Sequence, residues 1–390
     1  MGFFTGRITF SRYRVEGHAP EMFGLEHLDR LAEYQAGQSR LASADGIEVG
    51  WNAGDHIFDN NFDLAKNVVD DMLRFSLRID QEKLPSDLLR AYYEMDLKAL
   101  SANNPSGLPS ARQKREAKEG ARDRLEQEAK DGRYRKRKTI EVVWDRLSNE
   151  LYFGTTSAAQ VDRLLVLFRN TFNVGFEAIT AGKRAFDVAE LNQATRHVDD
   201  ATPSAFVPGI TPEGVAWIVD ERSRDFLGNE FLLWLWYLAE AETDTIKLMD
   251  NSEATFMLAR TLQLDCPRGQ TGNETINSEG PTRLPEARRA IQSGKLPRKV
   301  GLTLVRHGVQ YDMTIVAETL SITGLKIPVP EEDNDRARME ARAQQIRDLI
   351  ETLDLMFDAF GRRRFSGEWT RELLGIQKWL NRDEPRRMSA

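Results

Sequence analysis

The sequence has few of the residues that build disulfide frameworks and many metal sites. It contains one cysteine, Cys266, and five histidines among 390 residues. One thiol cannot form an intrachain disulfide, and it excludes zinc sites that need several cysteines. We therefore expect a protein of a reducing compartment, in which Cys266 is a small buried side chain rather than a nucleophile.

Long apolar runs are also missing. The richest run, FLLWLWY at 231–237, is far shorter than the about 18 residues that predict a membrane span. It is typical of a buried helix. Arg7, Arg12 and Arg14 interrupt the segment where a secretory signal needs an apolar core. These features predict a cytoplasmic protein with no membrane partner.

Common catalytic fingerprints do not occur: the sequence has no Walker loop, dinucleotide glycine fingerprint or paired-histidine zinc motif. The segment LVRHG at 304–308 resembles the phosphohistidine motif of histidine phosphatases, in which the arginine binds phosphate and the histidine is the nucleophile. That fold needs a second histidine further along the chain, and none follows His307. We therefore expect Arg306 and His307 to point to the solvent face of a strand, and we predict no cofactor.

Three acidic clusters offer an alternative chemistry. Asp199–Asp200, Glu240 with Glu242, and residues 331–333 could be proposed as magnesium-binding carboxylates of a nuclease. Each is explained more simply as a linker or as a solvated helix face. A metal-dependent exonuclease of DNA recombination or repair therefore remains the second hypothesis.

The most distinctive feature that is present is a basic stretch at 112–138. It contains 12 Lys/Arg and 6 Asp/Glu, a local charge of +6 in a chain of net charge −7. Clustered positive charge in an acidic protein favours a polyanionic partner, because phosphates bind it and release their counterions. The candidate DNA-binding residues are Arg112, Lys114, Arg115, Lys118, Arg122, Arg133, Tyr134, Arg135, Lys136, Arg137 and Lys138.

A helix stabilised by its own ion pairs is the competing interpretation of this stretch. Arg112/Glu116, Arg115/Glu119 and Arg122/Glu126 have the i,i+4 spacing of such pairs. The run 133–138 (RYRKRK) has no acidic residue inside it to offset its charge. The sequence therefore predicts that the end of the stretch is its most cationic part.

Hydrophobic periodicity predicts an α+β fold with mostly antiparallel sheets flanked by helices. We divide the chain into an N-terminal region (1–198) that includes a basic helix at 110–130, a second α+β subdomain (199–330) and a C-terminal helical segment (331–390). Strands are expected at 6–15, 46–51, 69–79, 138–144, 150–155, 172–179, 245–249, 254–265 and within 299–328. Helices are expected at 20–34, 84–100, 110–130, 157–172, from 180, and at 223–241, 284–294, 335–360 and 368–380, with a polar loop at 267–280.

The order of these segments resembles that of the recombination-associated RdgC family, over residues 3 to 360. The resemblance lies in the spacing of many short features rather than in one diagnostic motif. They are Phe3–Phe4, Tyr13–Arg14–Val15, Gly50–Trp51, Leu84–Pro85, the basic helix with Lys114, Glu116, Lys118 and Glu119, Trp144–Asp145, residues 155–172, residues 286–295, Leu320–Ser321–Ile322 and Leu325–Lys326.

This resemblance implies a ring-shaped homodimer with a positively charged hole. Duplex DNA would pass through the hole without sequence reading, and access of RecA to the DNA would be limited, so a nucleoid-associated protein is expected. Tyr134 falls where the family has an aromatic residue near the hole or the dimer contact. Asn277 and Ser278 fall near another proposed DNA contact, although the basic character of the family is missing there.

Residues and resemblance together predict a non-enzymatic protein that binds double-stranded DNA and forms a homodimer. The exonuclease is the alternative function. A third possibility is an interaction scaffold whose basic helix meets an acidic protein. The extra length of this chain, at 199–214 and past 360, could form a different tip or gate on the ring.

Overall fold

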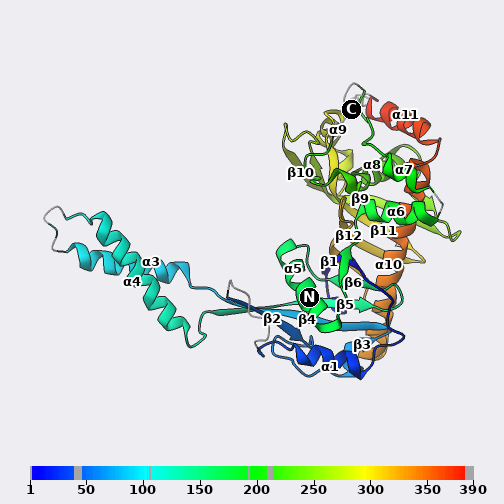
Figure 1. The fold of residues 1–390 in the computed structure, drawn as a ribbon. Helices are drawn as coiled ribbons and strands as arrows, with labels where there is room; N and C mark the ends of the chain where they lie inside the picture. Colours follow the sequence, from blue (N-terminus) through cyan, green and yellow to red (C-terminus); the bar gives the residue numbers. More distant parts are fainter. Residues whose placement is uncertain are drawn as a thin grey trace.

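The computed structural model describes residues 2–38, 46–102, 104, 107–191, 194–208 and 214–382. Its strands form one 13-stranded sheet whose main path runs β10-β9-β11-β12-β13-β1-β6-β5-β4-β2, with β3, β7 and β8 paired beside it. The pairings between these strands are antiparallel. Helices flank the sheet (Figure 1), so the predicted α+β class is confirmed.

The element boundaries follow the predicted pattern closely. The strands are β1 Ile8–Val15, β2 Ile47–Asn52, β3 Val68–Val69, β4 Met72–Glu82, β5 Arg135–Asp145, β6 Glu150–Phe153, β7 Phe176–Ala178, β8 Thr245–Lys247, β9 Glu253–Asp265, β10 Asn273–Ser278, β11 Leu296–Arg306, β12 Val309–Val316 and β13 Ile322–Lys326. The α-helices are α1 Leu25–Glu33, α2 Leu64–Asn67, α3 Ser86–Ser101, α4 Ala111–Ala129, α5 Ala158–Phe172, α6 Ala181–Leu191, α7 Thr195–Asp199, α8 Phe226–Ala241, α9 Pro285–Gln292, α10 Asp335–Arg364 and α11 Trp369–Leu380; η1 Glu221–Ser223 and η2 Pro281–Arg283 are 3-10 helices.

Two differences from the sequence prediction concern strands. The segment 267–280, predicted as a polar loop, contains β10, which pairs with the end of β9. The polar side chains of β10 hid this strand: its residues alternate between exposed and half-buried positions, but only Ile276 among them is apolar, so the apolar alternation that reveals a half-buried strand is missing. In addition, β5 begins at Arg135 rather than at the predicted residue 138, so most of the basic run 133–138 belongs to the strand.

The sheet has two faces, which strand alternation keeps separate. On β1, Ile8 and Phe10 belong to a core that includes side chains of α6, α8, α10 and α11, and we call this the outer face. Tyr13 and Val15 belong to a second core with α1 and α5, and we call this the inner face. The side chain of each strand residue can thus be assigned to one of these two faces.

The sheet is continuous through the first two of the three segments expected from the sequence. β13 pairs with β1, with Ile8 opposite Leu325. Helix α10 contacts both parts: Arg347 donates to Asp145 of β5 at 3.0 Å, and Arg306 of β11 donates to Thr352 of α10 at 3.1 Å. One helix therefore braces the outer face along much of its length (Figure 1).

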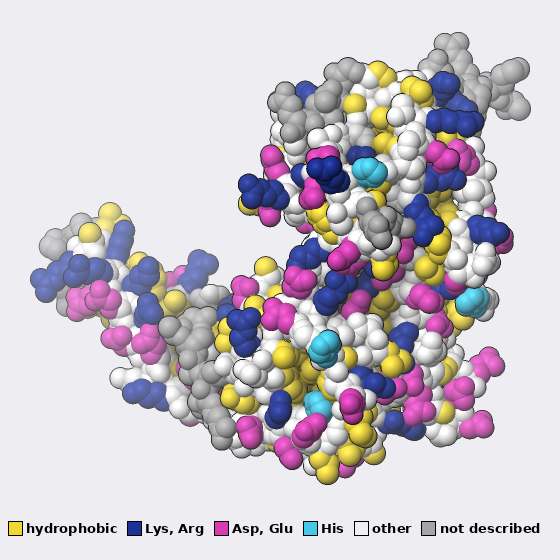
Figure 2. Space-filling view, turned by 45° about the vertical axis from the view of Figure 1, so that its right-hand side comes forward, with side chains coloured by type: hydrophobic (Ala, Val, Ile, Leu, Met, Phe, Trp, Pro, Cys, Tyr) yellow, Lys and Arg dark blue, Asp and Glu magenta, His cyan; other side chains and the backbone are white. Residues whose placement is uncertain are grey.

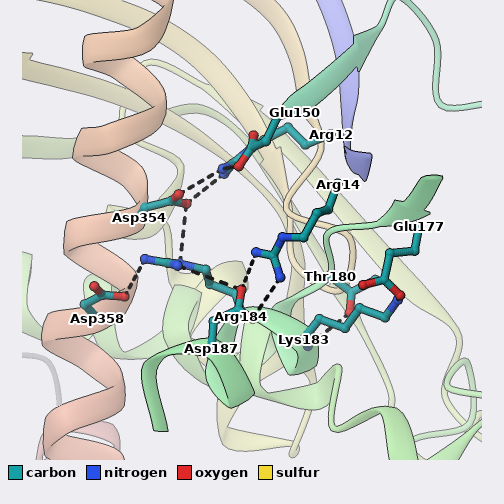
Figure 3. Close-up of polar contacts among 10 residues, drawn as sticks. All are labelled: Arg12, Arg14, Glu150, Glu177, Thr180, Lys183, Arg184, Asp187, Asp354 and Asp358. Carbon is teal, nitrogen blue, oxygen red and sulfur yellow. Dashed lines mark hydrogen bonds and ion pairs between the residues drawn. The ribbon is translucent and has the colours of Figure 1, made fainter. Parts of the chain in front are cut away.

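A seam of buried charge fixes α6 and α10 to the outer face (Figure 3). Arg12 of β1 bridges Glu150 of β6, at 2.9 Å, and Asp354 of α10, at 2.7 Å. Arg184 of α6 pairs with Asp358 of α10 at 2.9 Å. Since Arg12 is 3% exposed, its two carboxylate partners neutralise a charge that would be costly to bury alone.

Helices α3 and α4 project from the body as an antiparallel hairpin, which we call the arm (Figure 1). β4 leads into α3, and α4 leads back into β5. The two strands pair over their whole length, from Met72 opposite Asp145 to Glu82 opposite Arg135. The chain as a whole is a crescent, with a recess between the arm and the lobe that contains α8, α9 and α11.

No helix in the described ranges combines the length and the apolar character needed to cross a lipid bilayer.

Candidate nucleic-acid interface

Helix α4 is the predicted basic helix, and it begins with a capping box. The Ser110 hydroxyl accepts from the backbone N–H of Gln113, and the Gln113 side chain accepts from the backbone N–H of Ser110. These two bonds satisfy amides that a helix start leaves unpaired. The buried residues of α4 follow one another at intervals of four along a single stripe, namely Ala117, Ala121, Leu125 and Ala129. This narrow stripe packs on α3 and leaves the charged faces of α4 in solvent.

The base of the arm is held by polar contacts around Glu128. Its carboxylate accepts from the hydroxyl of Tyr92 at 2.8 Å and from that of Tyr134 at 2.6 Å. These two hydrogen bonds hold the pKa of Glu128 below its usual range. Arg124 donates to Asp96 of α3 at 3.0 Å and lies over the Tyr92 ring, 4.8 Å from its centroid. Tyr134, a candidate for contact with DNA, thus has its hydroxyl engaged inside the arm.

An open notch of about 530 Å³ lies between α3 and α4. Four cationic side chains and one tyrosine dominate its lining: Arg90 and Tyr93 of α3, and Lys114, Arg115 and Lys118 of α4. The structure therefore brings three of the candidates together and adds Arg90 and Tyr93, which the sequence analysis did not single out. Their position in the helix before the basic stretch gave no charge signal, since residues 86–101 contain more acidic than basic side chains.

The four cations of the notch differ in how far they are neutralised. Arg90 pairs with Glu94 at 2.9 Å and Arg115 with Glu119 at 3.5 Å, both on exposed helix surface. Lys114 and Lys118 have no carboxylate within ion-pair distance among the residues that the structure describes. Exposed pairs contribute little and exchange readily. An anion could thus bind to Lys114 and Lys118 in the notch without breaking an ion pair.

Two of the remaining candidates, Arg122 and Arg133, match the ion-paired interpretation, whereas the predicted pair of Arg112 with Glu116 does not form. Arg122 pairs with Glu126 at 2.7 Å, as its spacing predicts. Arg133 pairs with Asp131 at 2.6 Å, and this hydrogen bond holds the pKa of Asp131 below its ordinary value. Arg112 is exposed, with no ion pair in the described part of the chain. Figure 2 accordingly shows basic and acidic side chains interspersed along the arm rather than one uniform patch.

Strand alternation divides the run 135–138 between the two faces of the sheet. Arg135 and Arg137 lie on the outer face, where Arg135 pairs with Glu48 of β2 at 3.1 Å and Arg137 approaches Asp80 of β4 at 3.4 Å. Lys136 and Lys138 point to the inner face and are exposed, and no ion pair with either is found among the described residues.

The run 133–138 contains no acidic residue, as the sequence analysis states, but all three of its arginines are offset from outside it. Arg133 pairs with Asp131 just before the run. The acids that pair with Arg135 and Arg137 are supplied across the sheet by β2 and β4, whose residues lie far away in the sequence. The pairing of Asp80 with Arg137 and of Glu82 with Arg135 in the β4–β5 register brings them there. Among the described residues, the candidates that stay exposed without an ion pair are Arg112, Lys114 and Lys118 on α4 and the two inner-face lysines.

The LVRHG segment forms the end of β11 and a tight turn. Arg306 is 4% exposed and donates to Glu351 and Thr352 of α10, at 2.9 and 3.1 Å, and also to Asp250. His307 and Gly308 have positive φ values of 50° and 78°, as a two-residue hairpin turn requires. The prediction that Arg306 faces solvent is wrong, since it points to the outer-face helix; His307 is exposed, but in the turn rather than on the strand.

The acidic clusters have ordinary structural surroundings. Glu240 accepts from the indole N–H of Trp236 at 2.7 Å, and Glu242 accepts from the hydroxyl of Tyr237 at 2.7 Å. Asp199, Asp200 and residues 331–333 are exposed. Within the described ranges, no group of three or more His, Cys, Asp or Glu side chains is placed to hold a metal ion.

Cys266 is half-buried rather than packed in the interior, which corrects the sequence expectation. It lines a cavity of about 130 Å³ together with Arg268, Thr271 and Lys295. Burial raises the pKa of the thiol, but hydrogen bonds from the Thr271 hydroxyl and from the backbone N–H groups of Thr271, Arg268 and Gln270 outweigh it and lower the pKa to about 7.

Alkylation of Cys266 is therefore expected to reach half its maximal rate near pH 7 in the folded protein. The thiolate is the reacting form, and an ordinary thiol ionises near pH 8.5. The measurement is the rate of carboxamidomethylation by iodoacetamide between pH 5.5 and 9.5. Protein unfolded in urea is the control, and an identical midpoint in the two states would contradict the hydrogen-bonded thiolate.

The fold and this surface define an α+β protein with a projecting helical arm that bears a notch lined by cationic side chains. A scan against known protein families finds no family that matches this chain. A search of curated proteins finds no similar sequence.

Proposed function

We propose that this protein binds double-stranded DNA through its phosphates, without reading base sequence and without catalysing a reaction. The observation that carries the proposal is the notch, where Lys114 and Lys118 lie beside Arg90 and Arg115 and have no carboxylate partner in the described part of the chain. Lys136 and Lys138 add two more such lysines where the arm joins the sheet. Lysine acts as a compact point charge that suits phosphate contacts, and such contacts position a duplex rather than specify its sequence.

The acidity of the rest of the chain supports a confined DNA path. The molecule carries a net charge of −7, although the stretch 112–138 carries +6. Most of its surface therefore repels a phosphate polymer, whereas the notch and the inner-face lysines attract it. A duplex would be guided to the recess side of the crescent, where the arm stands opposite the other lobe (Figure 1).

A homodimer that encloses the duplex is the assembly we propose. One chain is an open crescent, and two crescents related by a two-fold axis can close a ring. The resemblance to RdgC proteins supports this arrangement, and it also suggests that the enclosed duplex becomes less accessible to RecA. The protein would then be associated with the nucleoid.

Binding to a duplex of about 30 base pairs is expected to fall steeply with salt. Four unpaired lysines that each neutralise one phosphate give a log–log slope of about −3.6 or steeper, so affinity should fall roughly 150-fold between 0.05 and 0.2 M salt. Fluorescence anisotropy with two duplexes of unrelated sequence measures the slope and the sequence dependence together. A flat salt response, or a large difference between the sequences, would contradict phosphate-based binding.

Enclosure predicts a difference between circular and linear DNA. Protein assembled on a closed circle should stay on it through a wash in 1 M salt, because a ring cannot leave a circle by sliding, whereas a linear duplex of the same length should be released. Cutting the retained circle with a restriction enzyme should then release the protein. If circular and linear DNA lose the protein equally in the wash, a closed ring is excluded, but the proposal of phosphate binding still stands. The molecular mass of the protein in solution gives the number of chains in the assembly.

A further inference from the structure

Among the described residues, no helix covers the inner face of the C-terminal half of the sheet. Its outer face carries Val300, Leu302 and Leu304 of β11, which are packed in the main core. The alternate residues of β11 and β12 point to the inner face, and among them Thr303 and Thr314 are only half-buried. In the N-terminal half α1 and α5 cover the inner face. In the C-terminal half a polar strand surface occupies this place.

This polar surface contains a pocket of about 230 Å³. It crosses four neighbouring strands and also includes Arg7 at the start of β1. Its polar side chains are two arginines and four threonines, namely Arg7, Arg260, Thr261, Thr303, Thr314 and Thr323. Guanidinium and hydroxyl groups donate hydrogen bonds that phosphate oxygens can accept.

The described lining of the pocket contains two arginines and no carboxylate. Asp312 beside it accepts from Arg260 at 3.1 Å and from Thr303 at 2.8 Å, so the charge of Arg260 is offset locally. Arg7 is exposed, and so are Lys299 of β11 and Lys326 of β13. No ion pair joins any of these three cations to a carboxylate in the described portion of the chain.

We infer that this surface is a second phosphate-binding site, which holds the backbone of the same duplex that the arm binds. The inference rests on the proposed function. Two observations carry it: the uncompensated cations Arg7 and Lys299, and the hydroxyl-rich pocket beside them. The surface lies on the same face of the same continuous sheet as Lys136 and Lys138.

The dimensions of the surface suit a phosphate backbone. Neighbouring strands are about 4.8 Å apart, so the pocket from β9 to β13 extends roughly 14 Å. Consecutive phosphates of a DNA strand follow a helical path, so they lie farther apart than the rise of about 3.4 Å along the axis, and this width accommodates about two of them. A twisted sheet face can contact a backbone without entering a groove, which agrees with binding that ignores base sequence.

The test is a charge reversal at two residues that leave no partner stranded, Arg7→Glu with Lys299→Glu. Its control is Arg371→Glu with Lys378→Glu on α11, two exposed positions that change the net charge by the same amount. Loss of two phosphate contacts should weaken binding of a 30-base-pair duplex roughly 60-fold at 0.1 M salt and reduce the log–log slope by about 1.8, while the control stays within a few-fold of wild type.

A neutral substitution separates local contact from general repulsion. Thr314→Val keeps the shape and the charge but removes a pocket hydroxyl, and we expect about a tenfold loss of affinity. If Arg7→Glu/Lys299→Glu behaves like the α11 control while reversal of Lys114 and Lys118 still weakens binding, only this second site is wrong. If folded wild-type protein fails to bind the duplex even at 0.05 M salt, the proposed function itself is wrong. Circular dichroism melting curves confirm that each variant is folded.

Discussion

Reversing the charge of Lys114 and Lys118 together is expected to weaken duplex binding roughly 60-fold at 0.1 M salt. Each phosphate contact contributes about 0.9 to the log–log slope, so two lost contacts remove about 1.8 from it. Neither lysine has a carboxylate partner in the described structure, so the double variant breaks no ion pair. The arm should keep its fold, because both side chains are exposed and the packed stripe of α4 is untouched.

Anisotropy titrations at four salt concentrations measure both quantities. The matched control on the arm is Arg122→Glu with Arg133→Glu, whose parent side chains are already paired with Glu126 and Asp131. This control makes the same change in net charge, at one position on α4 and at one in the turn that follows it. Equal losses in the two variants would show that the arm acts only through its total charge, and would remove the notch as a defined site.

Replacing Arg12 with methionine is expected to destabilise the folded protein by about 3–5 kcal/mol, which is the usual effect of breaking a buried ion pair from one side. The substitution leaves Glu150 and Asp354 facing each other across the seam without the guanidinium between them. Arg14→Met is the matched control. Its parent side chain is 43% exposed and pairs with Asp187 at 2.6 Å, so its removal should cost about 1 kcal/mol or less.

The free energy of unfolding of each variant and of the wild type is measured by urea titration, with tryptophan fluorescence as the signal. The pH dependence of this free energy provides a second test. In the wild type, burial alone would raise the pKa of Asp354, but the Arg12 guanidinium outweighs it and holds that pKa below its ordinary value. This contribution to stability is present above the unfolded pKa of about 4 and is lost as the pH falls through the folded pKa.

Without Arg12 the sign reverses for Asp354, whose pKa burial then raises. Burial already raises the pKa of Glu150 in the wild type, and loss of Arg12 removes the charge that opposes this rise. Protonation near pH 4 should therefore stabilise the variant relative to pH 7. The stability difference between wild type and Arg12→Met should therefore shrink as the pH is lowered from 7 to 4. A destabilisation no larger than that of Arg14→Met, or one that grows in acid, would contradict the buried seam.

Most of the elements could be predicted because their signals are local. Amphipathic spacing reveals α5 and α10, and the alternation in β11 and β12 reveals two half-buried strands. The cap of α4 is also visible as Ser110 followed by Gln113. Each of these signals lies within a few residues of the chain, where propensity and hydrogen bonding are decided.

The candidate site was predicted only in part, because charge in a sequence does not show its partners. Glu48 lies 87 residues before Arg135, and only the order of strands β2-β4-β5 brings their side chains together. The notch could not be predicted, because it forms only where α3 packs against the first half of α4 and brings Arg90 beside Lys118. The join of β1 to β13 could not be foreseen either, since strand register over such a separation leaves no local trace.

The connection of the arm has a mechanical consequence. The sheet narrows toward the arm: β2 pairs with β4 as far as Ile47 opposite Gln81, and in the described residues only Glu82 opposite Arg135 continues the β4–β5 ladder beyond it. A two-stranded connection twists and bends more easily than the interior of a wide sheet. The stretch of β4 and β5 near Glu82 and Arg135 is therefore the natural hinge of the crescent. If two chains do close around a duplex, they need not dissociate to load it: flexing at this joint could open a gap, and stiffening it with a disulfide would lock DNA in or out.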